Sequence, residues 1–253
     1  MNKLSVVIIT FNEEKNIERC LRSVGGIADE IIVVDSFSTD NTEVICARFN
    51  VRFSQHGFEG HIEQKNYAMS LATHPFVLSL DADEALSDEL AVSIRCALTN
   101  WTHDCYTINR LNNFCGQWIR HSGWYPDKKI RLFDKRKARW GGINPHDKII
   151  IEKGATCKEL EGNLLHFSFS SISQHIDQIN KFSGIKAKGA FAKNKKAGPW
   201  HIFILPLVKF FTIYFLKAGF LDGFYGFVIA LHSAWSVYLR GVKLRQLYKG
   251  LEL

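Results

Sequence analysis

Residues 4–14, LSVVIITFNEE, decide how this chain folds. The run from Leu4 to Ile9 is almost entirely apolar and rich in β-branched side chains, which is typical of a strand buried on both faces. Polar residues follow at once. Asn12 can cap a helix whose first turn holds Glu13 and Glu14, where acidic side chains favour the positive end of the helix dipole. The stretch therefore predicts a strand that leads directly into a helix.

The same alternation returns along the first hundred residues. Further strand candidates are EIIVVD (30–35), a short segment at 51–53 and FVLSL (76–80). Helical patterns cover residues 63–72 and the segment from Ser87 to Leu98. Strands that alternate with helices at this spacing predict an α/β fold with a doubly wound, mostly parallel, Rossmann-like sheet. From about residue 104 the pattern changes to short strand candidates separated by polar loops.

Polar residues stand where the predicted strands end. In an open parallel sheet, ligands bind beyond the carboxyl ends of the strands. Carboxylates after a buried strand are costly to bury unless they are paired or bind a cation, and oxygen ligands of this kind suit Mg²⁺ or Mn²⁺. The alternative is that they are solvated helix caps, since an Asp-x-Asp recurs by chance. The residues in question are Thr10, Asn12, Asp35, Asp81, Asp83 and Glu84.

Composition limits the class of protein. The chain has 253 residues, 46% of them apolar, so it can form a sizeable globular core. Its six cysteines are scattered without a CxxC pair, which favours reduced thiols over a disulfide framework or a zinc site. The apolar run at the N-terminus is too short for a signal peptide, so we expect a protein on the cytoplasmic side of the membrane.

Four blocks of the first hundred residues fit one family in order and spacing: VVIITFNEEKNIERCLRS (6–23), EIIVVDSFSTDNT (30–42), QKNYA (64–68) and FVLSLDADE (76–84). Together they resemble the inverting family 2 glycosyltransferases of GT-A fold. Later segments resemble a narrower group, the bacterial lipopolysaccharide core β-1,4-glucosyltransferases that use UDP-glucose. These segments are WYPDKKIRLFDK (124–135), NPHDKI (144–149), LLHFSFSS (164–171) and LKAGFLDGFYGF (216–227).

The resemblance implies a role for each residue at the strand ends. Thr10, Asn12 and Glu13 would line the nucleotide pocket. Asp35 would accept a hydrogen bond from the uracil ring, and Lys65 would lie against the diphosphate. Asp81 would contact the ribose, and Asp83 would bind Mg²⁺ or Mn²⁺. Glu84 would either support Asp83 without touching the metal itself or contact the donor sugar. A cation and a lysine together stabilise the charge of a departing diphosphate.

Inversion also needs a general base beyond the first hundred residues. The first candidate is Asp147, although the narrower group more often has glutamate after histidine at this place. The alternative for Asp147 is a turn carboxylate paired with Lys148 or Arg139. Asp127 is the second candidate and Glu84 the third. His166 is a candidate metal ligand or a satisfied core histidine, and His146 is a candidate for orienting Asp147 or contacting the acceptor.

The positive charge of the chain lies in its C-terminal part. Residues 1–177 carry a net charge of −3 and residues 178–253 one of +10, and eight lysines lie between Asp177 and Asp222 with no acidic residue among them. A basic segment beside long apolar runs is typical of contact with anionic lipid headgroups. Pro206 and Lys209 interrupt the apolar run, which favours in-plane or re-entrant helices over a membrane span. The alternative is packing onto the catalytic domain or a second subunit, giving a homo-oligomer.

We therefore expect a GT-A nucleotide-sugar and acceptor domain over residues 1–170 and a helical, membrane-associating tail over 171–253. The expected activity is transfer of a hexose, glucose from UDP-glucose, onto a heptose of the lipopolysaccharide inner core at the cytoplasmic face of the inner membrane. Rival acceptors are polyprenyl phosphate or another glycan. A rival of another class is a non-catalytic membrane adaptor. Nucleic acid is not expected as a partner, because the aromatic residues lie in long apolar runs.

Overall fold

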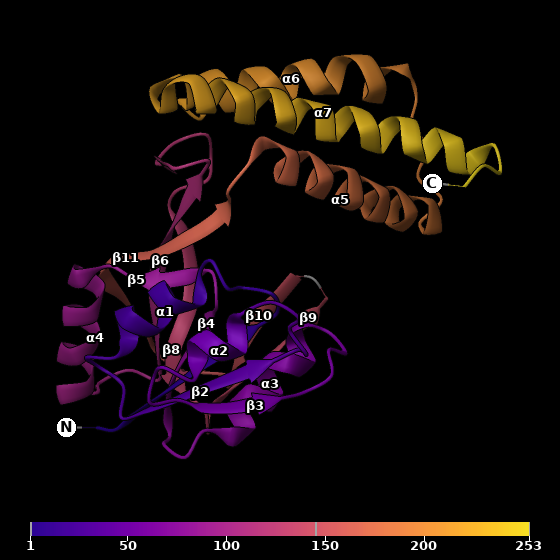
Figure 1. The fold of residues 1–253 in the computed structure, drawn as a ribbon. Helices are drawn as coiled ribbons and strands as arrows, with labels where there is room; N and C mark the ends of the chain where they lie inside the picture. Colours follow the sequence, from indigo (N-terminus) through magenta and orange to yellow (C-terminus); the bar gives the residue numbers. More distant parts are fainter. Residues whose placement is uncertain (1, 145, 253) are drawn as a thin grey trace. The chain divides into compact units, whose positions relative to one another are not determined.

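The computed structural model describes residues 2–144 and 146–252, and the chain forms two compact units (Figure 1). The first consists of Met1–Arg110 with Asp127–Phe167, and the second of Leu111–Pro126 with Ser168–Leu253. The second unit thus includes a segment before the tail. The assignment of functions to residues 1–170 and 171–253 stays a prediction.

Four parallel strands form one half of the sheet in the first unit. They are β1 (Leu4–Thr10), β2 (Glu30–Asp35), β3 (Arg52–Gln55) and β4 (Phe76–Asp81), in the order β3-β2-β1-β4. The register sets Thr10 opposite Asp35 and Ile9 opposite Asp81. Parallel pairing therefore brings the polar strand ends to the same edge of the sheet.

Helices cover both faces of these strands, and the alternation of side chains along β1 shows it. Val6 and Ile8 pack in a core cluster with residues of α1 (Ile17–Val24), α2 (Thr42–Cys46) and α4 (Asp88–Thr99). Val7 packs in a second cluster with residues of α3 (His61–Leu71). The predicted doubly wound α/β arrangement is confirmed.

The later strands pair antiparallel, so the sheet as a whole is mixed. Strand β8 (Asp127–Asp134) pairs with β4 and with β6 (Cys105–Phe114), and β11 (Cys157–Phe169) pairs with β5 (Glu84–Leu86). Strands β9 (Ala138–Ile143) and β10 (His146–Ile151) form a separate hairpin, and β7 (Gln117–Ile119) pairs with β6. The parallel order that the sequence predicts holds for β1 to β4.

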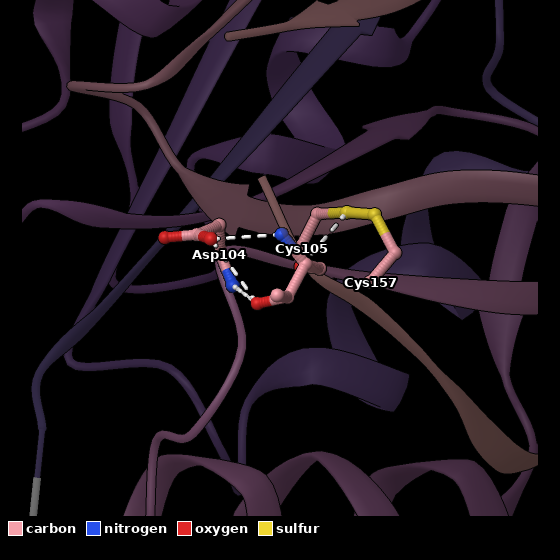
Figure 2. The surroundings of a disulfide bond; sticks show 4 residues. Asp104, Cys105 and Cys157 are labelled. Carbon is pink, nitrogen blue, oxygen red and sulfur yellow. Dashed lines mark hydrogen bonds between the residues drawn. A yellow bond between two sulfur atoms is a disulfide. The ribbon is translucent and has the colours of Figure 1, made fainter. Parts of the chain in front are cut away.

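A disulfide joins Cys105, at the start of β6, to Cys157, at the start of β11 (Figure 2). The expectation that all the thiols are reduced is therefore wrong for this pair. The two strands are neighbours in the sheet, and their Cα atoms lie 4.7 Å apart at the bridge although 52 residues separate them in sequence. That Cα separation lies within the usual range for a disulfide. Beside the bridge, Asp104 accepts a hydrogen bond from the backbone N–H of Thr156.

The second unit is mainly helical. It contains α5 (Ile172–Ala192), the π-helix η1 (Trp200–Ile204), α6 (Leu205–Phe211), the π-helix η2 (Thr212–Leu216), the 3₁₀-helix η3 (Gly219–Asp222) and α7 (Gly223–Tyr248). Helix α7 packs against both α5 and α6. Among the described residues, no single helix is long and apolar enough to cross a membrane. The helical stretches Trp200–Leu216 and Gly219–Tyr248, bent by 72°, meet that test only as a pair.

Buried Asp222 fixes the turn into α7. Its carboxylate accepts hydrogen bonds from the backbone N–H groups of Arg120 (3.0 Å) and His121 (3.1 Å) and from the hydroxyl of Ser122 (2.8 Å). A Cβ on Gly226 would lie 1.8 Å from the carbonyl oxygen of Gly219, so only glycine permits this approach. The acid that interrupts the apolar run thus has a structural role within this unit.

The disulfide generates a first prediction. A bridge across 52 residues constrains the unfolded chain, so reduction should lower the free energy of unfolding by about 2–4 kcal/mol. Thermal melts with and without reductant measure the effect, and a Cys105→Ser/Cys157→Ser variant is the control that should not respond. Alkylation and mass analysis of protein purified without reductant would contradict the bridge if both thiols were free.

Candidate active site

The strand ends carry the expected polar residues, and two loops hold them in place. Asp35 is fully buried and accepts a hydrogen bond from the backbone N–H of Ser38 at 2.8 Å. The Ser38 hydroxyl accepts from the backbone N–H of Asn12 at 2.8 Å, and the Asn12 side chain accepts from the N–H of Thr39. The loops after β1 and β2 are therefore locked together beside Thr10.

Asn12 does not cap a helix, which corrects the sequence prediction. Helix α1 begins at Ile17, and Asn12 has a φ of 53°, in the left-handed region that asparagine tolerates better than most residues. The backbone N–H of Glu13 donates to the hydroxyl of Thr42, the first residue of α2, at 2.9 Å, and that of Glu14 donates to the carboxylate of Asp40 at 3.0 Å. The polar residues here build a loop pair and not a first helical turn.

An ion network lies beneath these loops. The ammonium group of Lys65, on α3, lies 3.0 Å from Asp81 and 2.8 Å from Asp147. The guanidinium of Arg131, on β8, lies 2.8 Å from Asp81 and 2.6 Å from Glu84. Both cations are 3% exposed. Burial alone would raise the pKa of Asp81, but these two cations hold it well below its usual range.

Arg131 is the site residue that sequence reasoning missed. It stands between the apolar residues Ile130 and Leu132 of β8, and a cation at that place in the pattern is the signal that could have found it. Its Nε and Nη1 atoms have no hydrogen-bond partner among the described residues, and neither has Nε1 of Trp140 or the hydroxyl of Thr10. Buried donors without partners are rare, so they favour a bound polar ligand at this place.

Arg131 and Trp140 line a cavity of about 600 Å³ within the first unit, a size that ligand sites commonly have. Trp140 forms part of its wall, with the Lys65 ammonium 4.4 Å from the ring centroid. Other lining residues include Asp81, Arg131, Asp147 and Lys148. The cavity thus combines an aromatic wall with cations and two carboxylates.

Asp83 and His166 come together although 83 residues separate them. Nε2 of His166 lies 3.2 Å from Oδ2 of Asp83, because β11 pairs with β5 immediately after Asp83. Two ligands at neighbouring corners of an octahedron with bonds of about 2.1 Å lie about 3.0 Å apart, so these atoms fit one divalent cation. Burial, together with the nearby Asp83, raises the pKa of Glu13, which is consistent with an electronegative pocket here.

The described residues contain no group of three or more His, Cys, Asp or Glu side chains that would hold a metal by themselves. A cation held by Asp83 and His166 would therefore need further ligands from water or substrate. Mg²⁺ commonly binds in this way, through one or two protein ligands together with substrate phosphates. The donor set fits a metal that is completed by a diphosphate.

The base candidates differ in their surroundings. Asp147 lines the cavity and forms its ion pair with Lys65. The alternative from the sequence, a turn carboxylate paired with Lys148 or Arg139, is therefore wrong. Asp127, at the start of β8, lies 2.8 Å from Arg110 and 3.0 Å from Lys129. Glu84 is buried and bound to Arg131. The side chain of His146 lies outside the described part of the chain.

The ion network generates a second prediction. Arg131→Met would leave the partly buried carboxylate of Asp81 and the buried carboxylate of Glu84 without their guanidinium, which should cost about 3–5 kcal/mol of unfolding free energy. Urea denaturation measures the loss. Adding Glu84→Gln to that variant should recover part of it, because the uncompensated charge is removed. An Arg131→Met protein as stable as the native one would show that the network is unimportant for the fold.

Comparisons with known proteins identify the family of the chain. Residues 5–154 match the model of glycosyl transferase family 2. A glycosyltransferase of Rickettsia typhi, itself described as uncharacterized, is 33% identical over 257 residues, covering 98% of this chain and 88% of the relative. The lipopolysaccharide core biosynthesis glycosyltransferase LpsC of Rhizobium meliloti is 27% identical over 254 residues, covering 96% and 92%.

Among solved structures, glucosyl-3-phosphoglycerate synthase of Mycobacterium tuberculosis, in complex with Mn²⁺ and UDP-glucose, has a TM-score of 0.38 at 22% identity over 44% of each chain. The family match covers the parallel strands and the cavity residues, and relatives align along almost the whole chain. The predicted GT-A class is thereby confirmed, and this chain belongs to glycosyl transferase family 2.

Proposed function

We propose that the protein transfers glucose from UDP-glucose, with inversion, onto a heptose of the lipopolysaccharide inner core. The observation that carries the proposal is the cavity where Lys65, Asp81 and Arg131 meet at the end of β4, two residues before Asp83. The acceptor class rests on the likeness to LpsC, whose name assigns it to lipopolysaccharide core biosynthesis.

Asp83 and His166 would hold Mg²⁺ or Mn²⁺, and the cation would neutralise the diphosphate as it leaves. Lys65 would add a second positive charge against the same group, since its ammonium lies inside the cavity. Thr10 and Asp35 would bind the nucleoside at the neighbouring strand ends, with Asn12 and Glu13 in the loop beside them. These roles require the side-chain types that the chain presents: carboxylates, an imidazole and a buried lysine.

Asp147 is the proposed general base. It lines the cavity and is ion-paired with Lys65 at 2.8 Å, and the arriving diphosphate competes for the same ammonium group. Lys65 then turns to the phosphates, and the carboxylate of Asp147 is released to accept the proton of the acceptor hydroxyl. Asp127 is a weaker candidate because Arg110 and Lys129 both neutralise it.

Membrane attachment through the second unit belongs to the same proposal. Large apolar side chains of this unit are exposed, among them Phe203 (64%), Leu216 (81%) and Phe224 (69%). Apolar surface of this kind beside lysines favours binding in the interface of an anionic bilayer. Attachment at the cytoplasmic face of the inner membrane would bring the enzyme to a lipid-linked acceptor. Pairing of two copies through the same helices is the alternative use of this surface.

Asp83 provides the third prediction. Asp83→Asn should lower kcat for glucose transfer about 10²–10³-fold, because a ligand of the stabilising cation is lost. The measurement is the mass shift of a lipopolysaccharide core acceptor together with UDP release, with and without chelator. Glu18→Gln, which changes an exposed acid of α1, is the matched control and should keep full activity. Full activity of Asp83→Asn would exclude the metal role.

Asp147 provides the fourth prediction. Asp147→Asn should abolish transfer, because the general base is lost. KM for UDP-glucose should stay the same or fall, because Lys65 no longer has to break its ion pair with Asp147 in order to bind the diphosphate. Asp127→Asn is the comparison and should retain most of kcat. Steady-state kinetics that separate kcat from KM decide between them. Retained transfer with weakened donor binding would place Asp147 in the donor pocket and not at the acceptor.

A further inference from the structure

A second cavity, of about 480 Å³, lies wholly within the second unit. The C-terminal half of α5, the segment that follows it, η1 and the C-terminal half of α7 surround it. Its lining contains six basic side chains and no carboxylate, and the other lining residues are apolar or glycine. We call it the basic cavity, and its six basic residues are Lys186, Lys193, Lys195, Lys196, His201 and Arg240.

Within the described part of the chain, the structure records no ion pair or side-chain hydrogen bond for these six residues. Lys243, one turn after Arg240 on α7, shows the contrast, since its ammonium donates to the backbone oxygen of Asn180 (2.6 Å) and to the hydroxyl of Ser183 (2.9 Å). Asp222, the acid between η2 and α7, already binds backbone groups elsewhere in the unit. No carboxylate of the described residues therefore lines the basic cavity, and its lysines are exposed to solvent.

The end of helix α5 accounts for only part of this charge. The backbone N–H groups of Lys193 and Lys195 donate to the carbonyl oxygen of Ala190, which caps the helix. A helix C-terminus carries about half a negative charge and favours cations in its last turn. That effect explains lysines near the cap, but it does not explain Arg240, which comes from α7, and it balances less than one of the basic groups.

A cationic cavity favours an anionic ligand, and the side chains next to His201 indicate what kind of molecule bears the negative charge. Trp200, which precedes it in η1, is 60% exposed, and Phe203 is 64% exposed. An anionic group attached to an apolar body matches a cationic cavity beside such residues, as in basic pockets that bind lipid headgroups. Arginine and lysine together are the usual partners of phosphate oxygens.

We propose that the basic cavity binds the phosphate group of a membrane lipid and prefers a phosphomonoester headgroup to a phosphodiester. A phosphomonoester carries between one and two negative charges near neutral pH, since its second pKa is about 6, whereas a phosphodiester carries one. The six basic side chains repel one another, and the phosphomonoester, which carries more negative charge, offsets more of this repulsion than a phosphodiester does. The site selects a headgroup, which goes beyond general attraction to a charged surface. It rests on the proposed membrane attachment but not on sugar transfer.

The test uses the full chain and a matched pair of variants. Lys186→Gln/Arg240→Gln removes two cations from the basic cavity. Lys188→Gln/Arg245→Gln removes the same residue types from exposed positions on the same two helices, outside the cavity. Co-sedimentation is measured with phosphatidylcholine vesicles that contain either phosphatidic acid or phosphatidylglycerol, adjusted to equal surface potential. Thermal melts confirm that both variants fold.

The native protein should bind the phosphatidic acid vesicles about tenfold more tightly than the phosphatidylglycerol vesicles, because the phosphomonoester carries more negative charge. The cavity variant should lose that preference. The control variant should keep the preference.

Equal binding to the two vesicles, or equal losses in both variants, would show diffuse attraction and overturn the proposal. So would tight binding of inorganic phosphate alone, or a preference for single-stranded nucleic acid over vesicles. UDP binding by the first unit should be unchanged in both variants, which separates this outcome from a failure of the proposed transferase activity.

Discussion

The site depends on one constraint, which is that two buried cations need carboxylate partners. Lys65 and Arg131 are almost fully buried, and a charge in such a place costs several kcal/mol unless it is paired. Asp81 lies between them and accepts from both. Because the partners come from α3, β4 and β8, the network holds only when helix and strands have reached their final places. The polar end of β4 is thereby held by ion pairs from α3 and β8.

Two kinds of strand pairing bring the candidate site residues together. The parallel strands bring Thr10, Asp35 and Asp81 to one edge through their register. The antiparallel strands then return the chain to that edge and add Arg131 and, from β11, His166. Parallel strands alone would offer carboxylates for a nucleotide and a cation. The returning strands supply the guanidinium and the imidazole, and a residue of the β9–β10 hairpin, Asp147, faces the buried lysine.

The second unit uses charge in the opposite way. In the first unit the buried cations are paired with carboxylates, whereas the basic cavity leaves its cations unpaired among the described residues of this unit. The single buried acid of the tail, Asp222, is occupied by backbone N–H groups. The paired cations of the first unit suit the proposed reaction, in which a metal and a lysine would neutralise the negative charge of the substrate. The unpaired cations of the basic cavity suit a partner that brings its own negative charge.

The sequence alone determined the alternating strands and helices of the first hundred residues, because buried strands and amphipathic helices have different periods. It also determined which side chains stand at the strand ends. It did not reveal the role of Arg131, since this cation meets Asp81 only when β8 lies beside β4. Nor did it reveal the Cys105–Cys157 bridge, the pairing of Lys65 with Asp147 or the basic cavity. Each of these joins residues far apart in the chain, and only tertiary packing decides which distant side chains meet.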